Sequence, residues 1–158
     1  MAPDLPFQAD CLIVSGYPGG PGLPSLLEVC QREDKCFFLL TRAADGGELQ
    51  DLVAGDRLVY QVVGDLAHRL GSKELGKLGY GRAGIFLEGV YPSDLRELRK
   101  RWEGTFLLVD GTPLDARFAF DKYGRGAMAL LPPLPSPEEA RDRVQAVKEE
   151  FKEFVTIL

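Results

Sequence analysis

The hydrophobic residues of this chain gather in five short, nearly continuous runs, and between the runs they recur every three or four positions. The runs cover residues 11–15, 36–41, 83–87, 105–109 and 127–131. Short apolar runs without polar alternation are typical of parallel strands covered on both faces, whereas a spacing of three or four residues predicts helices. The pattern therefore predicts strands that alternate with helices along the whole chain.

The segments between the runs also carry signals for where helices begin. Apolar spacing predicts helices over residues 57–70 and 93–102, and Pro24 is expected to open an earlier helix. Near the end of the chain, Ser136 and Glu139 form an S-x-x-E capping box, which marks the start of a last amphipathic helix. The element order is thus βαβαβαβαβα.

This order predicts a single α/β domain over residues 1–158, built from five parallel βα units. Two architectures satisfy it. One is part of an eight-stranded TIM barrel, and the other is an open flavodoxin-like sheet with helices on both faces. Right-handed crossovers occur in both, so periodicity alone leaves the two alternatives open.

Composition excludes several classes of partner. With 24 acidic and 19 basic side chains the formal net charge is −5, and no basic patch of the kind that binds nucleic acid is evident. No apolar run approaches the roughly 20 residues that span a bilayer, and the first ten residues lack a secretory leader, so we expect a cytoplasmic protein without membrane contact. Cys11, Cys30 and Cys36 lack metal-site spacing, so we expect buried free thiols, no metal and no cofactor.

Several polar residues follow the predicted strands directly, where parallel α/β proteins bind ligands. Arg42 could bind a phosphate or carboxylate through its guanidinium group, or it could pair with Asp45 or Glu88 at neighbouring strand ends. An acid after the fourth run could act as a base or could cap the turn at the following glycine. The candidate ligand-binding residues are Tyr17, Arg42, Asp45, Glu88 and Asp110.

Five segments, in order, resemble the later part of orotidine 5′-phosphate decarboxylases of the larger bacterial type. Residues 9–28 resemble the fourth strand of that family and its loop, and residues 36–52, which end in LQDL, resemble the fifth. The segment GVYPSDLRELR at 89–99 resembles the stretch after the sixth strand, while TFLLVDG and YGRGAMALL resemble the seventh and eighth. The resemblance implies the last five βα units of a TIM barrel and a place in pyrimidine nucleotide synthesis.

The chain also departs from that family. The D-x-K-x-x-D motif, which carries the lysine and aspartates for decarboxylation in that family, is absent, so we predict no catalytic residue in this chain. Ala43 and Ala44 stand where the family has a pyrimidine-facing Ser-Asn. Residues 111–115 and 131–134 lack the glutamine and the arginine that would hold the phosphate. We therefore expect that the chain alone is not an enzyme; any activity would be that of a carboxy-lyase acting on orotidine 5′-phosphate.

Three functional hypotheses follow from these features. The first is a degenerate decarboxylase-like protein, a pseudoenzyme with a binding or assembly role. The second is the C-terminal half of a split or truncated decarboxylase that needs a partner half. The third is a small-molecule or phosphate binder on an open α/β sheet. Because five strands of a barrel would leave two exposed edges, we expect a homodimer, a partner half-barrel or a rearranged sheet, with a nucleotide or phosphate as the ligand.

Overall fold

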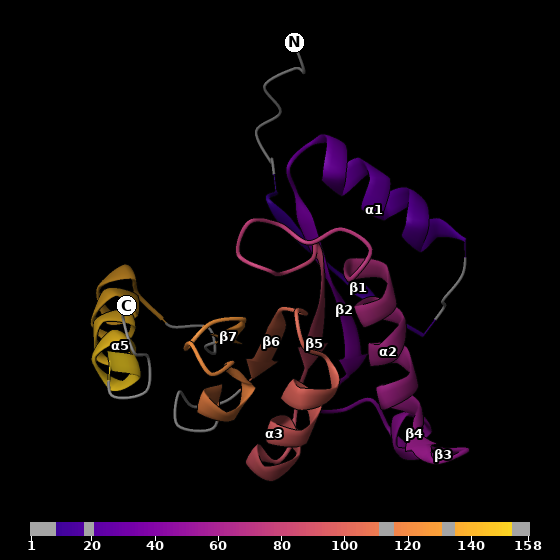
Figure 1. Ribbon diagram of the computed structural model, residues 1–158. Coiled ribbons are helices and arrows are strands. Elements are labelled where there is room, and N and C mark those ends of the chain that lie inside the picture. Colours follow the sequence, from indigo (N-terminus) through magenta and orange to yellow (C-terminus); the bar gives the residue numbers. More distant parts are fainter. Residues whose placement is uncertain (1–8, 18–20, 111–115, 131–134, 153–158) are drawn as a thin grey trace.

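A computed structural model of the chain describes residues 9–17, 21–110, 116–130 and 135–152. Its main feature is a sheet of five parallel strands that lie side by side in chain order (Figure 1). The predicted strands are confirmed, and their ends differ from the prediction by two residues at most. From edge to edge the strands are β1 (Cys11–Ser15), β2 (Cys36–Arg42), β5 (Ala83–Leu87), β6 (Leu107–Asp110) and β7 (Ala127–Leu130).

The order of the strands decides between the two predicted architectures. A flavodoxin-like sheet has the order 2-1-3-4-5, in which the chain reverses direction across the sheet. Here each strand pairs with the next strand of the same sheet along the chain, in the order β1-β2-β5-β6-β7. The register is continuous apart from one irregularity between Leu40 and Arg42. Strands in sequential order are what a segment of a (β/α)₈ barrel requires. The sheet is therefore a partial barrel.

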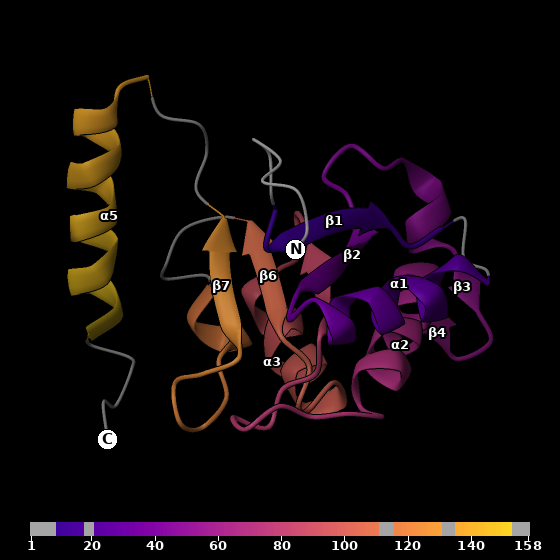
Figure 2. The ribbon, with the colours of Figure 1, turned by 90° about the horizontal axis from the view of Figure 1, so that it is seen from above.

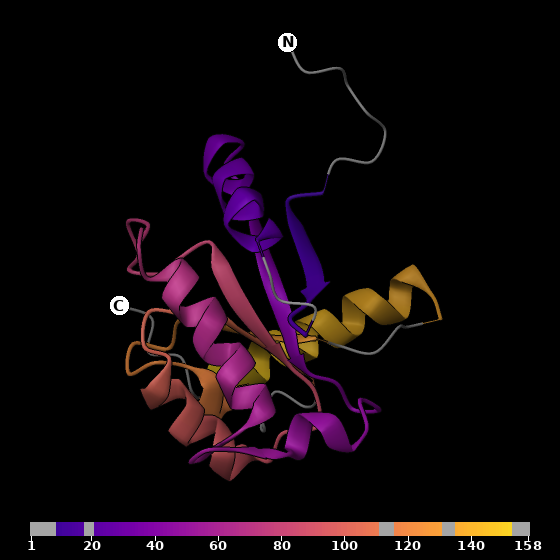
Figure 3. The ribbon, with the colours of Figure 1, turned by 90° about the vertical axis from the view of Figure 1, so that its right-hand side faces the viewer.

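Three helices cover the same face of this sheet (Figure 3). The last helix lies beyond β7 (Figure 2), where Phe151 packs edge-on against Phe120, with the ring centroids 5.3 Å apart. A short 3-10 helix, η2 (Arg117–Ala119), precedes β7. The helices are α1 (Gly22–Arg32), α2 (Val59–Gly71), α3 (Pro92–Arg101) and α5 (Pro137–Lys152).

The helix predicted over residues 57–70 begins later than expected. Its first two residues form a short strand, β4 (Arg57–Leu58), that pairs with β3 (Val53–Ala54) around Gly55, whose φ of +72° is easy only for glycine. The side chain of Gln61 then accepts a hydrogen bond from the Leu58 backbone N–H at 3.1 Å, which satisfies an amide at the start of α2. The capping box of α5 is confirmed on its serine side, because Glu139 N donates to Ser136 Oγ at 3.2 Å.

The two faces of the sheet are both apolar but are covered differently. On the helix side, side chains such as Phe37, Leu39, Ile85 and Trp102 are completely buried. The opposite side, which we call the open face, carries a smaller cluster. Strand register adds three exposed residues to it, namely Ile13, Met128 and Leu130. The cluster consists of Phe38, Phe86 and Leu108 with Cys11, Leu40 and Phe106 packed against them.

The described residues contain no helix long and apolar enough to cross a membrane. They also contain no group of three or more His, Cys, Asp or Glu side chains that could hold a metal ion. All three cysteines are free; Cys30 is buried, and Cys11 and Cys36 are half-buried. Burial, followed by the neighbouring Cys36, raises the pKa of Cys11 to about 12, so this thiol stays protonated at neutral pH. The cytoplasmic location remains a prediction of the sequence.

Candidate ligand site at the carboxyl ends of the strands

All five candidate residues lie at the carboxyl ends of the strands or in the loops that follow. Tyr17 follows β1, Arg42 ends β2, Asp45 lies in the next loop, Glu88 follows β5 and Asp110 ends β6. Since parallel strands bring these ends to one edge of the sheet, the predicted positions share one edge. We call this edge the strand-end rim and define it as residues 16–17, 42–51, 88–89 and 110.

Arg42 is the most strongly bound side chain of the rim. Its Nη1 donates to the backbone carbonyls of Glu88 and Gly89, both at 2.8 Å, and its Nη2 lies 3.2 Å from Asp51 Oδ2. Its Nε donates to the other Asp51 oxygen at 3.4 Å. These bonds use four of the five guanidinium N–H groups. The predicted pairing with the carboxylate of Asp45 or Glu88 is wrong, because the ion-pair partner of Arg42 is Asp51 and the Glu88 carboxylate accepts from Ala44 N.

Gln50 organises the loop after β2, and the sequence analysis missed it. Its side chain is almost fully buried, with Oε1 accepting from Ala43 N at 3.0 Å and Nε2 donating to Ala43 O at 2.8 Å. These two hydrogen bonds close the loop from residue 43 to residue 50, because they satisfy both backbone groups of Ala43 as a neighbouring strand would. The one available signal in the sequence was the LQDL segment at residues 49–52, which resembles the decarboxylase family and contains this glutamine. The loop conformation thus depends on a single buried amide.

Glu88 and Asp110 hold the ends of three strands together. Glu88 Oε2 accepts from Ala44 N at 3.1 Å, and Asp110 Oδ1 accepts from Gly89 N at 2.9 Å. Gly89 has a φ of +62°, which favours glycine, and a Cβ there would lie 2.9 Å from Arg42 Nη1, so a larger residue would have to displace this guanidinium group. The turn that Asp110 was predicted to cap begins at Gly111, which lies outside the described residues.

Tyr17 lies against the end of β2. Its hydroxyl donates to the Thr41 carbonyl at 2.7 Å, and the Thr41 hydroxyl in turn donates to Phe86 O at 3.1 Å. Burial, followed by the negative charge of Asp51, raises the pKa of Tyr17, so the phenol stays neutral and remains a donor at physiological pH. The hydroxyl of Tyr17 therefore ties the end of β1 to the end of β2.

The chemistry that the rim offers is mainly that of hydrogen-bond acceptors. The amides of Ala43, Ala44 and Gly89 already donate to side chains, and Arg42 is almost saturated. Asp45 is exposed and makes no hydrogen bond or ion pair with another residue in the described part of the chain. Free carboxylate oxygens accept hydrogen bonds from hydroxyl or N–H groups and repel phosphate. The rim therefore suits the sugar or the ring N–H of a ligand better than its phosphate.

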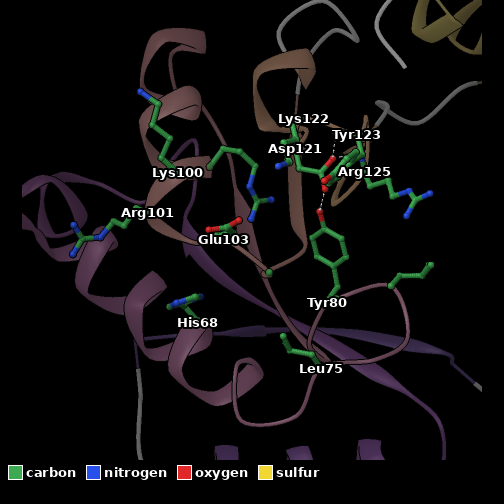
Figure 4. Close-up of a pocket in the computed structure, with 14 residues that line it drawn as sticks. His68, Leu75, Tyr80, Lys100, Arg101, Glu103, Asp121, Lys122, Tyr123 and Arg125 are labelled. Carbon is green, nitrogen blue, oxygen red and sulfur yellow. Dashed lines mark hydrogen bonds between the residues drawn. The ribbon is translucent and has the colours of Figure 1, made fainter. Parts of the chain in front are cut away.

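A cavity of about 940 Å³ lies at the opposite end of the sheet (Figure 4). The loops that precede β5, β6 and β7 line it, and it contains basic side chains that include Arg99, Arg101 and Arg125. Most of its charges already have partners. Arg99 donates to the carbonyls of Ala119, Trp102 and Gly126, and burial lowers the pKa of this guanidinium. The rim is therefore the better candidate for a ligand site.

Tyr80 and Asp121 show how the polar groups around this cavity hold the structure together. The Tyr80 hydroxyl donates to Asp121 Oδ2 at 2.6 Å, as Figure 4 shows. The other Asp121 oxygen accepts from the backbone amides of Tyr123 and Arg125, both at 2.8 Å, and so closes the turn before β7. Burial, followed by the hydrogen bond to Asp121, raises the pKa of Tyr80 to about 12. Every polar atom of this pair is used to hold loops.

Known proteins similar to this chain were found among sequences and among structures, although no protein-family model matches it. The orotidine 5′-phosphate decarboxylase of Rhodopirellula baltica is 37% identical over 131 residues, which is 78% of this chain and 43% of that protein. The enzyme of the same name from Clostridium novyi is 31% identical over 108 residues, 66% of this chain and 38% of that protein. The chain thus spans less than half the length of these curated relatives.

Solved structures support the same relationship at the level of the fold. The OMP decarboxylase of Leishmania donovani superimposes with a TM-score of 0.68 at 24% identity, covering 92% of this chain and 56% of that one. The UMP synthase of the same organism gives a TM-score of 0.63 at 25% identity, covering 92% and 32%. In sequence and in fold, this chain is therefore related to the C-terminal portion of orotidine 5′-phosphate decarboxylases.

Proposed function

We propose that this chain forms the C-terminal part of an orotidine 5′-phosphate decarboxylase barrel and does not decarboxylate alone. It would act once an N-terminal part that carries the acid–base residues joins it. Decarboxylation replaces a carboxylate by a proton, so the site needs a group that donates a proton to the carbon that loses CO₂. The observation that supports the proposal is the absence of a lysine from the strand-end rim, all of whose residues are described.

All seven lysines of the chain lie among the described residues, and none follows a strand of the five-stranded sheet. Four precede strands, at the end of the sheet opposite the rim, and three lie on helices. A lysine general acid for the proposed reaction would therefore have to come from another segment. In chain order the lysines are Lys35, Lys73, Lys77, Lys100, Lys122, Lys148 and Lys152.

The contribution of this chain would be to position the nucleotide. Glu88 and Asp110 each keep one carboxylate oxygen that bonds to no other described residue, and these oxygens can accept hydrogen bonds from ribose hydroxyl groups or from the ring N–H of a pyrimidine. The bonds of Arg42 and Gln50 hold the loop after β2 in place before any ligand arrives, so little ordering would accompany binding. This is the preorganisation that a binding rim needs.

A second candidate is the degenerate relative, which keeps the fold and has a binding or assembly role without catalysis. The methyl groups of Ala43 and Ala44, in place of the polar side chains expected there, favour this candidate, and so does the nearly saturated Arg42. Both candidates predict an inactive isolated chain. They differ in what happens when the missing catalytic residues are supplied.

Carbon dioxide release from orotidine 5′-phosphate distinguishes the two candidates. The assay would compare this chain, the N-terminal portion of the Rhodopirellula baltica enzyme that lies outside the match, and a mixture of the two. The proposal predicts turnover by the mixture alone, and loss of that turnover when the lysine of the D-x-K-x-x-D motif in the added segment is replaced by alanine. Turnover by this chain alone, or an inactive complex of the two segments, would contradict it.

A further inference from the structure

We propose that the open face and the two outer edges of the sheet form a docking surface for a three-stranded parallel β/α segment. This inference rests on the proposed function, because it names the partner that would complete the barrel. It concerns assembly, however, and can be tested without any turnover.

The open face is apolar and only its centre is covered. Phe38, Phe86 and Leu108 are nearly buried there, whereas at the margins Ile13 is 49% exposed and Met128 is 46% exposed. Ile13 lies on one edge strand and Met128 on the other, so the exposed apolar surface follows both margins of the sheet. Exposed apolar surface of this kind, continuous with a buried cluster, marks an interaction site.

A hollow of about 340 Å³ deepens the open face near the starts of the strands. Its lining includes Phe38 of β2, Met128 of β7, and Tyr80 and Phe106, which lie just before β5 and β6. In a closed barrel the interior is filled by layers of side chains contributed by alternate strands. A hollow of this size, on the side that would be the barrel interior, is the space that side chains from additional strands would fill.

Both edges of the sheet are open to pairing. Among the described residues, β1 pairs only with β2, and β7 pairs only with β6. The edge sequences CLIVS and AMAL contain neither a charged residue nor a proline, which are common means of blocking edge-to-edge association. An edge that is left unblocked is suited to receive another strand.

The number of strands identifies the occupant. A barrel of this class closes with eight parallel strands, whose side chains just fill the interior. This chain supplies five in sequential order, so three remain. A second copy would bring five more and give ten strands, which does not match this closure. The curated relatives have more than half their length outside the match, which is ample for three βα units.

The test uses this chain and the N-terminal portion of the Rhodopirellula baltica enzyme that lies outside the match, without substrate. We expect a one-to-one complex in a solution mass measurement. Hydrogen exchange of the outward-facing amides of β1 and β7 should slow on mixing, whereas that of the central strand β5 should not change. The same exchange data show whether each variant is folded.

Matched variants separate this surface from the rest of the molecule. Ile13→Glu or Met128→Glu should weaken the complex by about ten-fold or more, because each buries an unpaired carboxylate in the interface. Val62→Glu makes the same change at an exposed position of α2 and should leave the affinity unchanged. Absence of a complex, or a homodimer of this chain in which β1 and β7 are already protected, would overturn the inference. A complex without turnover would contradict the proposed function alone.

Discussion

The carboxylate of Asp65 joins α2 to the end of α3, and its replacement by asparagine should destabilise the fold in a pH-dependent manner. Asp65 accepts two hydrogen bonds from Arg101, at 2.8 and 2.7 Å, one from Trp102 Nε1 at 2.8 Å, and one from Arg57. Its side chain is 15% exposed. Burial alone would raise the pKa of this carboxyl, but the bonds from Arg101 and Trp102 outweigh burial and lower the pKa to about 2.

The magnitude follows from linkage between protonation and folding. A pKa near 2 in place of 3.8 corresponds to about 2.4 kcal/mol of stabilisation at neutral pH, at about 1.36 kcal/mol per pH unit. Because the folded-state pKa is the lower one, this stabilisation is complete above about pH 5 and is lost as the pH falls toward 2. Near pH 3 about half of it should remain.

Urea denaturation of the wild type and of Asp65→Asn at pH 7, 5 and 3 measures this difference. The two should differ by about 2–3 kcal/mol at pH 7 and pH 5, and by about half as much at pH 3. Asp56→Asn is the control, because Asp56 pairs with Arg57 while fully exposed, and it should leave the free energy of unfolding unchanged. An equal difference at pH 7 and pH 3, or none at all, would refute the reasoning.

Three further predictions concern single side chains. Gln50→Leu should lower the free energy of unfolding by about 1–3 kcal/mol in urea denaturation, because it leaves the backbone N–H and C=O of Ala43 without partners; an unchanged value would contradict the role of this amide. Gly64→Ala should cost about 1–3 kcal/mol in the same assay, since the new Cβ would lie 2.3 Å from the Trp102 ring; it should also alter the tryptophan fluorescence of the folded protein. In a spectrophotometric titration Tyr80 should ionise near pH 12, and its titration near pH 10 in the folded protein would contradict the buried hydrogen bond.

The sequence predicts the strands and most helices because both depend on local apolar spacing. The β3–β4 hairpin escaped prediction, since Leu58 fits the four-residue spacing of the following helix and nothing in the spacing reveals the turn at Gly55. The order of the strands in the sheet, in contrast, could not be predicted from local apolar spacing. It depends on which strands pair across the sheet, and these non-local contacts leave no trace in the periodicity of a single chain. The choice between a partial barrel and a flavodoxin-like sheet therefore needed the structure.

The position of the candidate site was predictable, but its bonding was not. Residues that directly follow strands, such as Tyr17 and Glu88, must lie at one edge of a parallel sheet. Which acid Arg42 meets depends on the path of the loop after β2, and that path is set by the buried amide of Gln50, which no spacing rule identifies. Ligand binding by the five candidates remains a prediction.

A crystal structure of this chain mixed with the N-terminal portion of the Rhodopirellula baltica enzyme tests the central claim most directly. The account predicts one closed barrel of eight parallel strands, in which β1 and β7 each pair with a strand of the added segment and the hollow on the open face is filled. The added lysine should then lie beside the strand-end rim, near Asp110 and Glu88. A five-stranded sheet that keeps both edges unpaired, or that joins a second copy of itself, would contradict the account.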